Sequence, residues 1–298
     1  NTVCVDGISA YPVMKSNHSF KLLHSYPEPS NAEERNLESA DYFRGVCYSE
    51  TYFLEPMTQA DQTRLLSIVD AEDGGYYVDI FRSRKRDGGD VMHDYFYHNL
   101  GQDMTLTAAD GSPLSLQPSE ELSFAGGYLY AYSYIYDQQM AQTGQDIRAD
   151  FTVRPEKGGE DIRMTMWQQG MPDRKIFRAL SPETEGLSRD NTMPYTIKGA
   201  PTLTYVARQS GEAWTRPFVS VFEPSTSSGG NRIGNVEFFT PESEGGDAAG
   251  ILVSLKDGRK DMILSSADAE KEIRHEGMAA RATYVCLQRK EGRPVRFF

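Results

Sequence analysis

The chain has 298 residues, of which 39% are hydrophobic and 25% charged, a composition that indicates a globular protein and excludes a largely disordered one. Lys and Arg total 31 against 43 Asp and Glu, and the net charge of -12 argues against a nucleic-acid-binding protein. No apolar run approaches the length that spans a membrane. The 17 Tyr and 14 Phe favour strands over helices.

Alternating apolar and polar residues predict strands throughout the first half of the chain. These strands cover residues 1–5, 63–69, 76–82, 94–98 and 104–107. The polar loop 70–75 ends in Gly74-Gly75 and suits a hairpin between its flanking strands. The first strand begins at the first residue and runs into the turn Asp6-Gly7, so we expect the natural chain to extend upstream. Residues 111–150 lack a regular pattern and are expected to be irregular.

The second half shows the same style of pattern without repeating the sequence. Strands are predicted at residues 162–168, 202–206, 217–222, 251–255, 261–264, 282–287 and 295–298. Asp257-Gly258 predicts a tight hairpin, and Glu291-Gly292 predicts a turn. Helical periodicity is confined to residues 32–37, which Ser30 could cap.

Many short strands separated by turns predict an all-β fold, an antiparallel β-sandwich of several stacked sheets with little helix. The length suffices for two portions, and we divide them at the irregular stretch. Residues 1–125 are expected to form the first sandwich layers, and residues 126–298 a second β-rich portion packed on them.

Two groups of residues give little indication of a site. The densest basic run, Arg82, Arg84, Lys85 and Arg86, is followed at once by acidic residues, which favours a solvated hairpin tip over a binding groove. Cys4, Cys47 and Cys286 are widely spaced and form no C-x-x-C pair, so the sequence predicts no metal site in this chain. Their spacing does not decide the redox compartment.

The five histidines offer no clear catalytic or metal-binding set. His93 and His98 are five residues apart, so on one regular strand their side chains point to opposite faces, although a bulge could bring them together. Both are interpreted first as structural residues, with contact to a sugar as the alternative. His18 and His24 lie in a Pro/Ser/Asn-rich stretch, where exposed loop positions or sugar contacts are both open, and His275 is expected to be solvated.

The tyrosines around these histidines are the other candidates, because aromatic rings stack on sugars and a tyrosine near a cation can transfer a proton. Tyr95 and Tyr97 share one face of their predicted strand, and we expect that face to point outward, with Phe96 and Leu100 toward the core. Covering an adjoining domain is the competing interpretation. The candidate substrate-binding residues are therefore Tyr95, Tyr97, His98 and His93.

Several segments together resemble the heparinase II/III-type polysaccharide lyases. Residues 1–7, Asn-Thr-Val-Cys-Val-Asp-Gly, resemble the family's H-N-T-V-x-V-D-G signature, whose leading histidine would precede Asn1. Later segments resemble the family's strands in the same order, and these are residues 76–81, 93–98 with Gly101, 127–130, 218–224 with Ile233 and Val236, and 258–264. The resemblance covers nearly the whole chain.

The resemblance implies the carboxy-terminal β-sandwich region of an enzyme that cleaves uronic-acid-containing acidic polysaccharide by β-elimination. In that family an amino-terminal α/α toroid packs on the sandwich and supplies main catalytic residues. The zinc-associated His/Asp set lies upstream of Asn1, so the resemblance assigns no catalytic residue and no metal or other cofactor to this chain. The expected partners are an acidic polysaccharide and the toroid of the same parent protein.

Three roles remain open from the sequence: supporting the cleft of a parent lyase without turnover alone, binding carbohydrate without catalysis, and a structural interaction domain. The polysaccharide itself stays open among heparinoids (glycosaminoglycans), alginate and ulvan. The resemblance further implies a secreted or periplasmic bacterial protein, with cell-surface anchoring through the upstream portion as one option.

Overall fold

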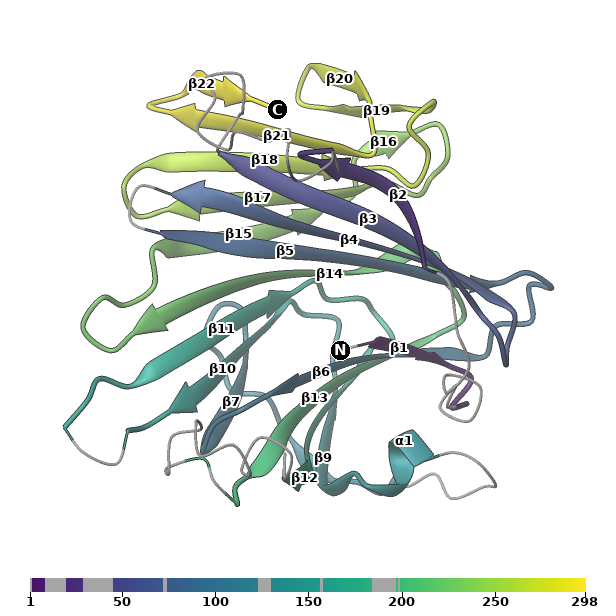
Figure 1. Ribbon diagram of the computed structural model, residues 1–298, viewed down its shortest axis with the longest axis vertical. Coiled ribbons are helices and arrows are strands. Elements are labelled where there is room, and N and C mark those ends of the chain that lie inside the picture. The colour runs from purple at the N-terminus through teal and green to yellow at the C-terminus, as the bar shows by residue number, and fades with distance from the viewer. Residues whose placement is uncertain are drawn as a thin grey trace, which may run out of the picture.

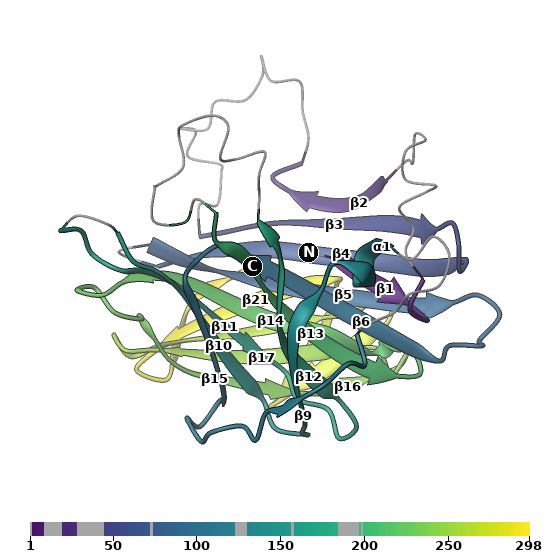
Figure 2. The same cartoon turned by 90° about the horizontal axis from the view of Figure 1, so that it is seen from below.

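The computed structural model describes residues 2–8, 20–28, 45–71, 74–122, 130–155, 158–183, 197 and 199–298, which form four antiparallel sheets. The predicted all-β class is confirmed. Figure 1 shows the sheets as stacked layers, with the six-stranded sheet at the bottom, the eight-stranded sheet in the middle and the five-stranded sheet at the top. Seen from below in Figure 2, the six-stranded sheet lies across the eight-stranded one.

The eight-stranded sheet is the central layer, and its strands follow the order β2-β3-β4-β5-β14-β11-β10-β7. Their bounds are β2 Lys21–Tyr26, β3 Val46–Glu55, β4 Ala60–Ala71, β5 Gly74–Lys85, β7 Asp103–Ala108, β10 Ile147–Val153, β11 Ile162–Gln168 and β14 Ala213–Thr226. The predicted hairpin at residues 70–75 is confirmed, because β4 and β5 pair in continuous register up to Ala71 and Gly74.

The six-stranded sheet follows the order β1-β6-β13-β12-β9-β8. Its strands are β1 Thr2–Val5, β6 Met92–Asn99, β8 Gln117–Pro118, β9 Tyr136–Gln142, β12 Lys175–Glu183 and β13 Pro201–Ser210. The short helix α1 Tyr130–Ser133 precedes β9. Strand β6 pairs with β1 on one side and with β13 on the other, so it is an interior strand.

The remaining strands form two smaller sheets. The five-stranded sheet has the order β15-β17-β18-β21-β22 and the three-stranded sheet the order β16-β19-β20. Their bounds are β15 Ile233–Phe239, β16 Glu242–Ser243, β17 Ala249–Leu255, β18 Arg259–Ser265, β19 Glu272–His275, β20 Met278–Arg281, β21 Tyr284–Lys290 and β22 Arg293–Phe297. The predicted turns at Asp257-Gly258 and Glu291-Gly292 connect β17 to β18 and β21 to β22.

Alternating side chains fill a separate core on each side of the central sheet. Val78 and Ile80 of β5 face the five-stranded sheet, where they pack with residues such as Ile251 and Ile263. Phe81 on the same strand lies in the core shared with the six-stranded sheet. Because both faces of β5 are covered, most of its residues are buried, including charged ones.

Two expectations about chain organisation can be compared with the sheets. The portions 1–125 and 126–298 each contribute strands to both of the larger sheets, where they share backbone hydrogen bonds. The expected irregularity of residues 111–150 was wrong for β9 and for the start of β10, which pair with β12 and β11. The helix expected at residues 32–37 lies outside the described residues.

The basic run was only partly solvated, and its prediction as a hairpin tip was wrong for Arg82. That side chain lies within β5, is 0% exposed and points toward the five-stranded sheet, because strand alternation places it on the same face as Ile80. Its Nη2 donates hydrogen bonds to the carbonyl oxygens of Asp247 and Ser265, at 3.2 and 3.3 Å. Arg86, in the turn beyond the strand, is exposed and pairs with Asp61 at 3.0 Å.

The three cysteines are free thiols. Cys286 is buried and Cys4 is half-buried. Burial raises the pKa of the Cys4 thiol to about 12, so this thiol is protonated at neutral pH. Among the described residues, no helix has the length and apolar character needed to cross a membrane.

Candidate functional site

Tyr95, one of the sequence-predicted substrate contacts, is completely buried. Its hydroxyl donates a hydrogen bond to Asp79 Oδ2 at 2.9 Å, and its ring stacks on Phe218 with 5.4 Å between centroids. Burial, and next the charge of Asp79, raise the pKa of Tyr95 well above its usual value of 10. A tyrosine held this way is a poor proton acceptor at neutral pH.

Tyr97 lies on the same inward face, half-buried against Phe222 and Phe151. The expectation that Tyr95 and Tyr97 point outward was therefore wrong. The reason is that β6 is an interior strand covered on both sides: the tyrosines face the central sheet, while Phe96 lies in a third core on the opposite side. Alternation correctly separated the two sets of residues but could not tell that both would be covered.

His93 and His98 lie on opposite faces of β6, as their odd spacing predicts. His93 is buried, with Nε2 at 2.8 Å from Asp90 Oδ1. His98 is stacked with Phe96, and its Nδ1 lies 3.0 Å from Thr204 Oγ1. Burial lowers the pKa of His98 to about 4, so this imidazole is neutral at neutral pH.

Contact between a polysaccharide and His93, Tyr95, Tyr97 or His98 stays a prediction, and for the fully buried pair it would require the core to open. Among the described residues, no three His, Cys, Asp or Glu side chains are grouped to hold a metal ion. His24 is exposed on β2, whereas His18 lies outside the described residues.

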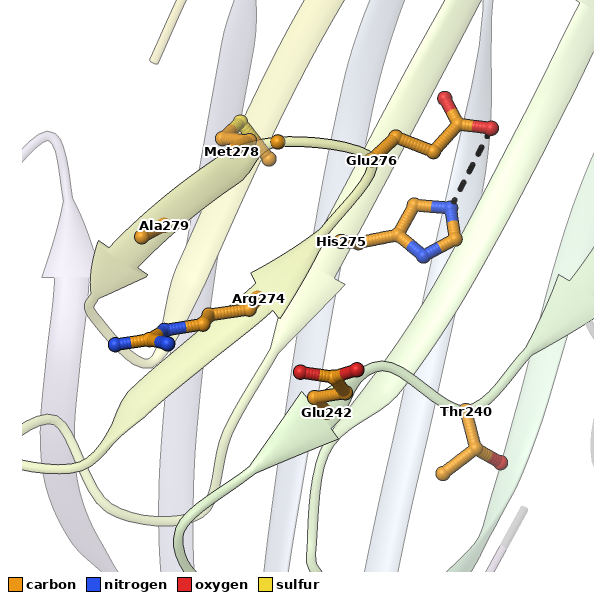
Figure 3. A pocket seen from close by; sticks show the side chains of 8 residues that line it. Thr240, Glu242, Arg274, His275, Glu276, Met278 and Ala279 are labelled. Carbon is orange, nitrogen blue, oxygen red and sulfur yellow. Dashed lines mark ion pairs between the residues drawn. The ribbon is translucent and has the colours of Figure 1, made fainter.

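A pocket of about 570 Å³ surrounds His275, at the turn between β19 and β20. Figure 3 shows the imidazole beside the carboxylate of Glu276, at 4.0 Å, with Glu242 on the neighbouring strand and Arg274 directed away from them. The side chain of His275 is 28% exposed. The expectation of a solvated histidine is therefore confirmed only in part, because the ring is also partly covered.

Phe239 provides that cover. Its ring stacks on His275, with 3.9 Å between centroids and 22° between planes. The Phe239 ring also lies against Gly250, its cross-strand partner on β17, where a Cβ atom would overlap the ring. The missing side chain thus lets Phe239 lie flat on the sheet and support the imidazole.

A second pocket of about 360 Å³ shares His275 and Glu276 with the first and opens over the outer face of the five-stranded sheet. Leu252 and Met262, which are cross-strand partners, form apolar lining. Lys260 and Arg289, also cross-strand partners, supply positive charge. The combined surface offers an apolar floor and the half-buried imidazole, with charged side chains of both signs around them, which suits binding of a polar ligand. These side chains are Lys260, Arg274, Arg289, Glu237, Glu242 and Glu276.

Reasoning from the sequence missed this surface, because its cations come from strands that are distant in the chain. Lys260 precedes Arg289 by 29 positions, and only the antiparallel pairing of β18 with β21 sets them opposite each other. The basic residues from 289 to 296 do not mark this surface in the sequence, because Arg289 lines it whereas Lys290, Arg293 and Arg296 do not. A search for dense consecutive charge selects residues 82–86 instead.

Comparison with known proteins gives one informative relationship. No protein-family model matches the chain. It is similar to an endo-acting ulvan lyase of Formosa agariphila, with 28% identity over 244 residues, a segment that covers 78% of this chain and 28% of that protein. The chain thus spans less than a third of the relative's length. The similarity marks a distant homology to a polysaccharide lyase and does not identify a family of such enzymes.

Proposed function

We propose that this chain is the β-sheet region of a polysaccharide lyase that acts on an acidic, uronic-acid-containing polysaccharide, and that it completes and supports the substrate cleft without turnover of its own. The observation that carries the proposal is the similarity to the ulvan lyase, which extends over most of this chain but only 28% of that enzyme. A segment with this coverage fits one structural part of a larger enzyme.

The chemistry of β-elimination supports an auxiliary role. The reaction needs a group that neutralises the uronate carboxylate and a base that removes the neighbouring carbon-bound proton. In this chain the Tyr95 hydroxyl is held by Asp79 inside the core, and His93 is held by Asp90. Both groups are therefore bonded to other residues inside the protein and are not accessible to a substrate.

In this proposal the main catalytic residues belong to a helical toroid upstream of Asn1, which is the partner that the sandwich supports. Any zinc ligands belong to an upstream segment of the sandwich itself. We also propose a secreted or periplasmic location, because an enzyme encounters polymeric acidic polysaccharides outside the cytoplasm. Both points rest on the sequence resemblance described above.

The proposal is tested by comparing this chain alone with the full-length parent protein. Each is incubated with ulvan, alginate and heparan sulfate, and release of unsaturated uronate is followed by its ultraviolet absorbance. We expect turnover of at least one substrate by the parent and none by this chain. Turnover by the isolated chain would contradict the auxiliary role, and absence of lyase activity in the parent would contradict the enzyme class.

A second function, carbohydrate binding without catalysis, is favoured by one specific observation. The pocket over Leu252 and Met262 is lined by Lys260 and Arg289 together with Glu237 and Glu276. An apolar floor surrounded by side chains that can donate and accept hydrogen bonds is the kind of lining that a polar ligand such as a sugar would require.

A further inference from the structure

One face of the central sheet is covered by a second layer over only part of its width. On β5 and β14 this face carries Phe81, Phe218 and Phe222, which are buried in the core shared with the six-stranded sheet. The same face continues through β4 and β3 to the edge strand β2, and Figure 2 shows β2 and β3 at the margin of the sheet. On this continuation the large apolar side chains of the described residues are not buried.

Five large hydrophobic side chains on this continuation are each at least 40% exposed. They are Phe20, Leu22, Leu66, Ile68 and Tyr77, and we call them the apolar face. Ile68 and Tyr77 are cross-strand partners, and Leu66 points the same way as Ile68, two positions later on β4. Pairing through β3 puts Leu22 on the same side, and Phe20 stacks on Phe53 of β3 with 4.7 Å between centroids. A contiguous exposed apolar patch of this kind marks a surface where another protein surface packs.

The charge within the apolar face is balanced. Arg64 lies two positions before Leu66 on β4, and its Nη2 is 2.6 Å from Oδ2 of the buried Asp79. Ser49 and Thr51 of β3 place small uncharged groups between the apolar side chains. Because the Arg64 guanidinium is already neutralised, a polyanion would gain little here, whereas the apolar surface of a folded protein fits.

The position of β1 indicates which protein surface this is. Gln62, at the near end of the same face of β4, donates a hydrogen bond to the Val3 carbonyl oxygen at 3.2 Å. Thr2 is the cross-strand partner of Phe96, so the polypeptide that precedes β1 approaches from the direction of Tyr97. The Tyr97 ring packs on Phe222 at 4.8 Å, and Phe222 is the cross-strand partner of Tyr77. A preceding portion of the protein is therefore joined to this chain beside the apolar face.

We propose that the apolar face is the surface on which the upstream portion of the parent protein packs. The inference rests on the proposed function, which makes this chain one part of a larger enzyme, and it adds where the two parts meet. The aligned segment is only 28% of the ulvan lyase, and a parent of similar length has a large remainder to supply the opposing surface. A second copy of this chain fits less well, because each copy carries a net charge of -12.

Cys47 is a built-in probe of this contact. It is a free, half-buried thiol on β3 and is the cross-strand partner of Ile68, so it lies within the apolar face. The experiment measures the rate at which N-ethylmaleimide modifies Cys47, in this chain alone and in the full-length parent, by mass spectrometry of the Cys47 peptide. We expect the reaction in the parent to be slower by about tenfold or more, because a covered thiol reacts only when its cover opens.

Two matched double variants of the parent locate the contact. Leu66→Glu, Ile68→Glu places two charges in the apolar face, and Cys47 should then react as fast as it does in the isolated chain. The control is Val295→Glu, Phe297→Glu, which adds the same charge at two exposed apolar positions on β22. In the control Cys47 should stay slow. Circular dichroism checks that each variant is folded, and the comparison of chain with parent needs no variant.

Equal rates at Cys47 in the chain and the parent would overturn the proposal, as would equal effects of the two double variants. A rate in the isolated chain that falls as its concentration rises, with dimers in sedimentation, would assign the face to a second copy instead. None of these measurements uses turnover. A parent that protects Cys47 but lacks lyase activity contradicts only the enzyme class, and an active parent with an open Cys47 contradicts only the packing surface.

Discussion

Two buried carboxylates in this molecule differ in how many hydrogen-bond partners the protein gives them. Asp94, on β6, accepts hydrogen bonds from Arg208 Nε and Nη2, both at 2.8 Å, and from the Tyr132 hydroxyl at 2.6 Å. Glu50, on β3, is 1% exposed and has no hydrogen-bond partner for Oε2 among the described residues. The first carboxylate is fully paired within the core, whereas the second is not.

The unpaired region lies between the central and five-stranded sheets. On the same sheet face as Glu50, the described structure leaves Thr63 Oγ1 and two Arg82 nitrogens, Nε and Nη1, without partners. Burial raises the pKa of Glu50 to about 7, and the charge of Arg82 only partly opposes this rise. The comparison teaches that burial alone does not determine whether a carboxylate is charged, because the geometry of its partners decides.

The largest effect should follow from breaking the paired cluster. Asp94→Asn removes the ion pair that holds Arg208 at 2.8 Å and leaves a guanidinium that is 13% exposed. We expect unfolding free energy to fall by about 3–5 kcal/mol, since an uncompensated buried charge is left. Urea denaturation measures this value.

The matched control for that variant is Asp103→Asn, which breaks the exposed pair with Arg154 at 3.2 Å. For this variant the unfolding free energy should fall by less than about 1 kcal/mol, because solvent already screens the two charges. Comparable losses in the two variants would mean that the Asp94 cluster does not stabilise the six-stranded sheet as its geometry suggests.

The second prediction concerns pH and the unpaired carboxylate. Because the folded pKa of Glu50 is about 7 against a usual value of 4.5, the folded state keeps a proton that the unfolded state releases. The contribution of Glu50 to the free energy of unfolding is fully present below pH 4.5 and is lost as the pH rises through 7. We expect Glu50→Gln to remove this loss, which amounts to about 2–3 kcal/mol.

Denaturation of both proteins at pH 5 and pH 8 provides the measurement. The variant should gain stability relative to the unchanged chain at pH 8 and differ little at pH 5. A variant that is equally destabilised at both pH values would show instead that Glu50 makes favourable contacts in its charged form.

The comparison also separates what the sequence could predict from what it could not. The hairpin around Asp257-Gly258 was predictable because both strands and the turn are contiguous and the alternation of Ile251, Val253 and Leu255 is local. The alternation of Ile147, Ala149 and Phe151 in β10 was equally readable and was missed. By contrast, β9 is mostly polar, and its pairing with β12 and β8 defines it.

Partners of charged residues were the unpredictable part. Asp94 meets Arg208 across 114 positions, and Lys260 meets Arg289 only through strand pairing. Arg82 belonged to the densest basic segment, yet alternation within a strand covered on both faces buried it. Composition indicates how many charges a chain has, whereas the stacking of sheets decides which of them lose contact with water.

The third and smallest effect tests a group whose titration opposes that of Glu50. Burial lowers the pKa of His98 from 6.5 to about 4, so the unfolded state takes up a proton that the folded state refuses. This contribution is fully present above pH 6.5 and is lost as the pH falls through 4. His98 is half-buried, and we therefore expect a loss of only about 1–2 kcal/mol.

His98→Gln should flatten the acid side of the stability profile between pH 6.5 and 4, as measured by urea denaturation at half-unit steps. Thr204→Val is the control, because it removes the hydrogen-bond partner at 3.0 Å but keeps the imidazole. It should lower stability at every pH without flattening the profile. A profile that is unchanged in His98→Gln would mean that the acid sensitivity comes from other groups and that the face of β6 bearing Phe96 is open to water.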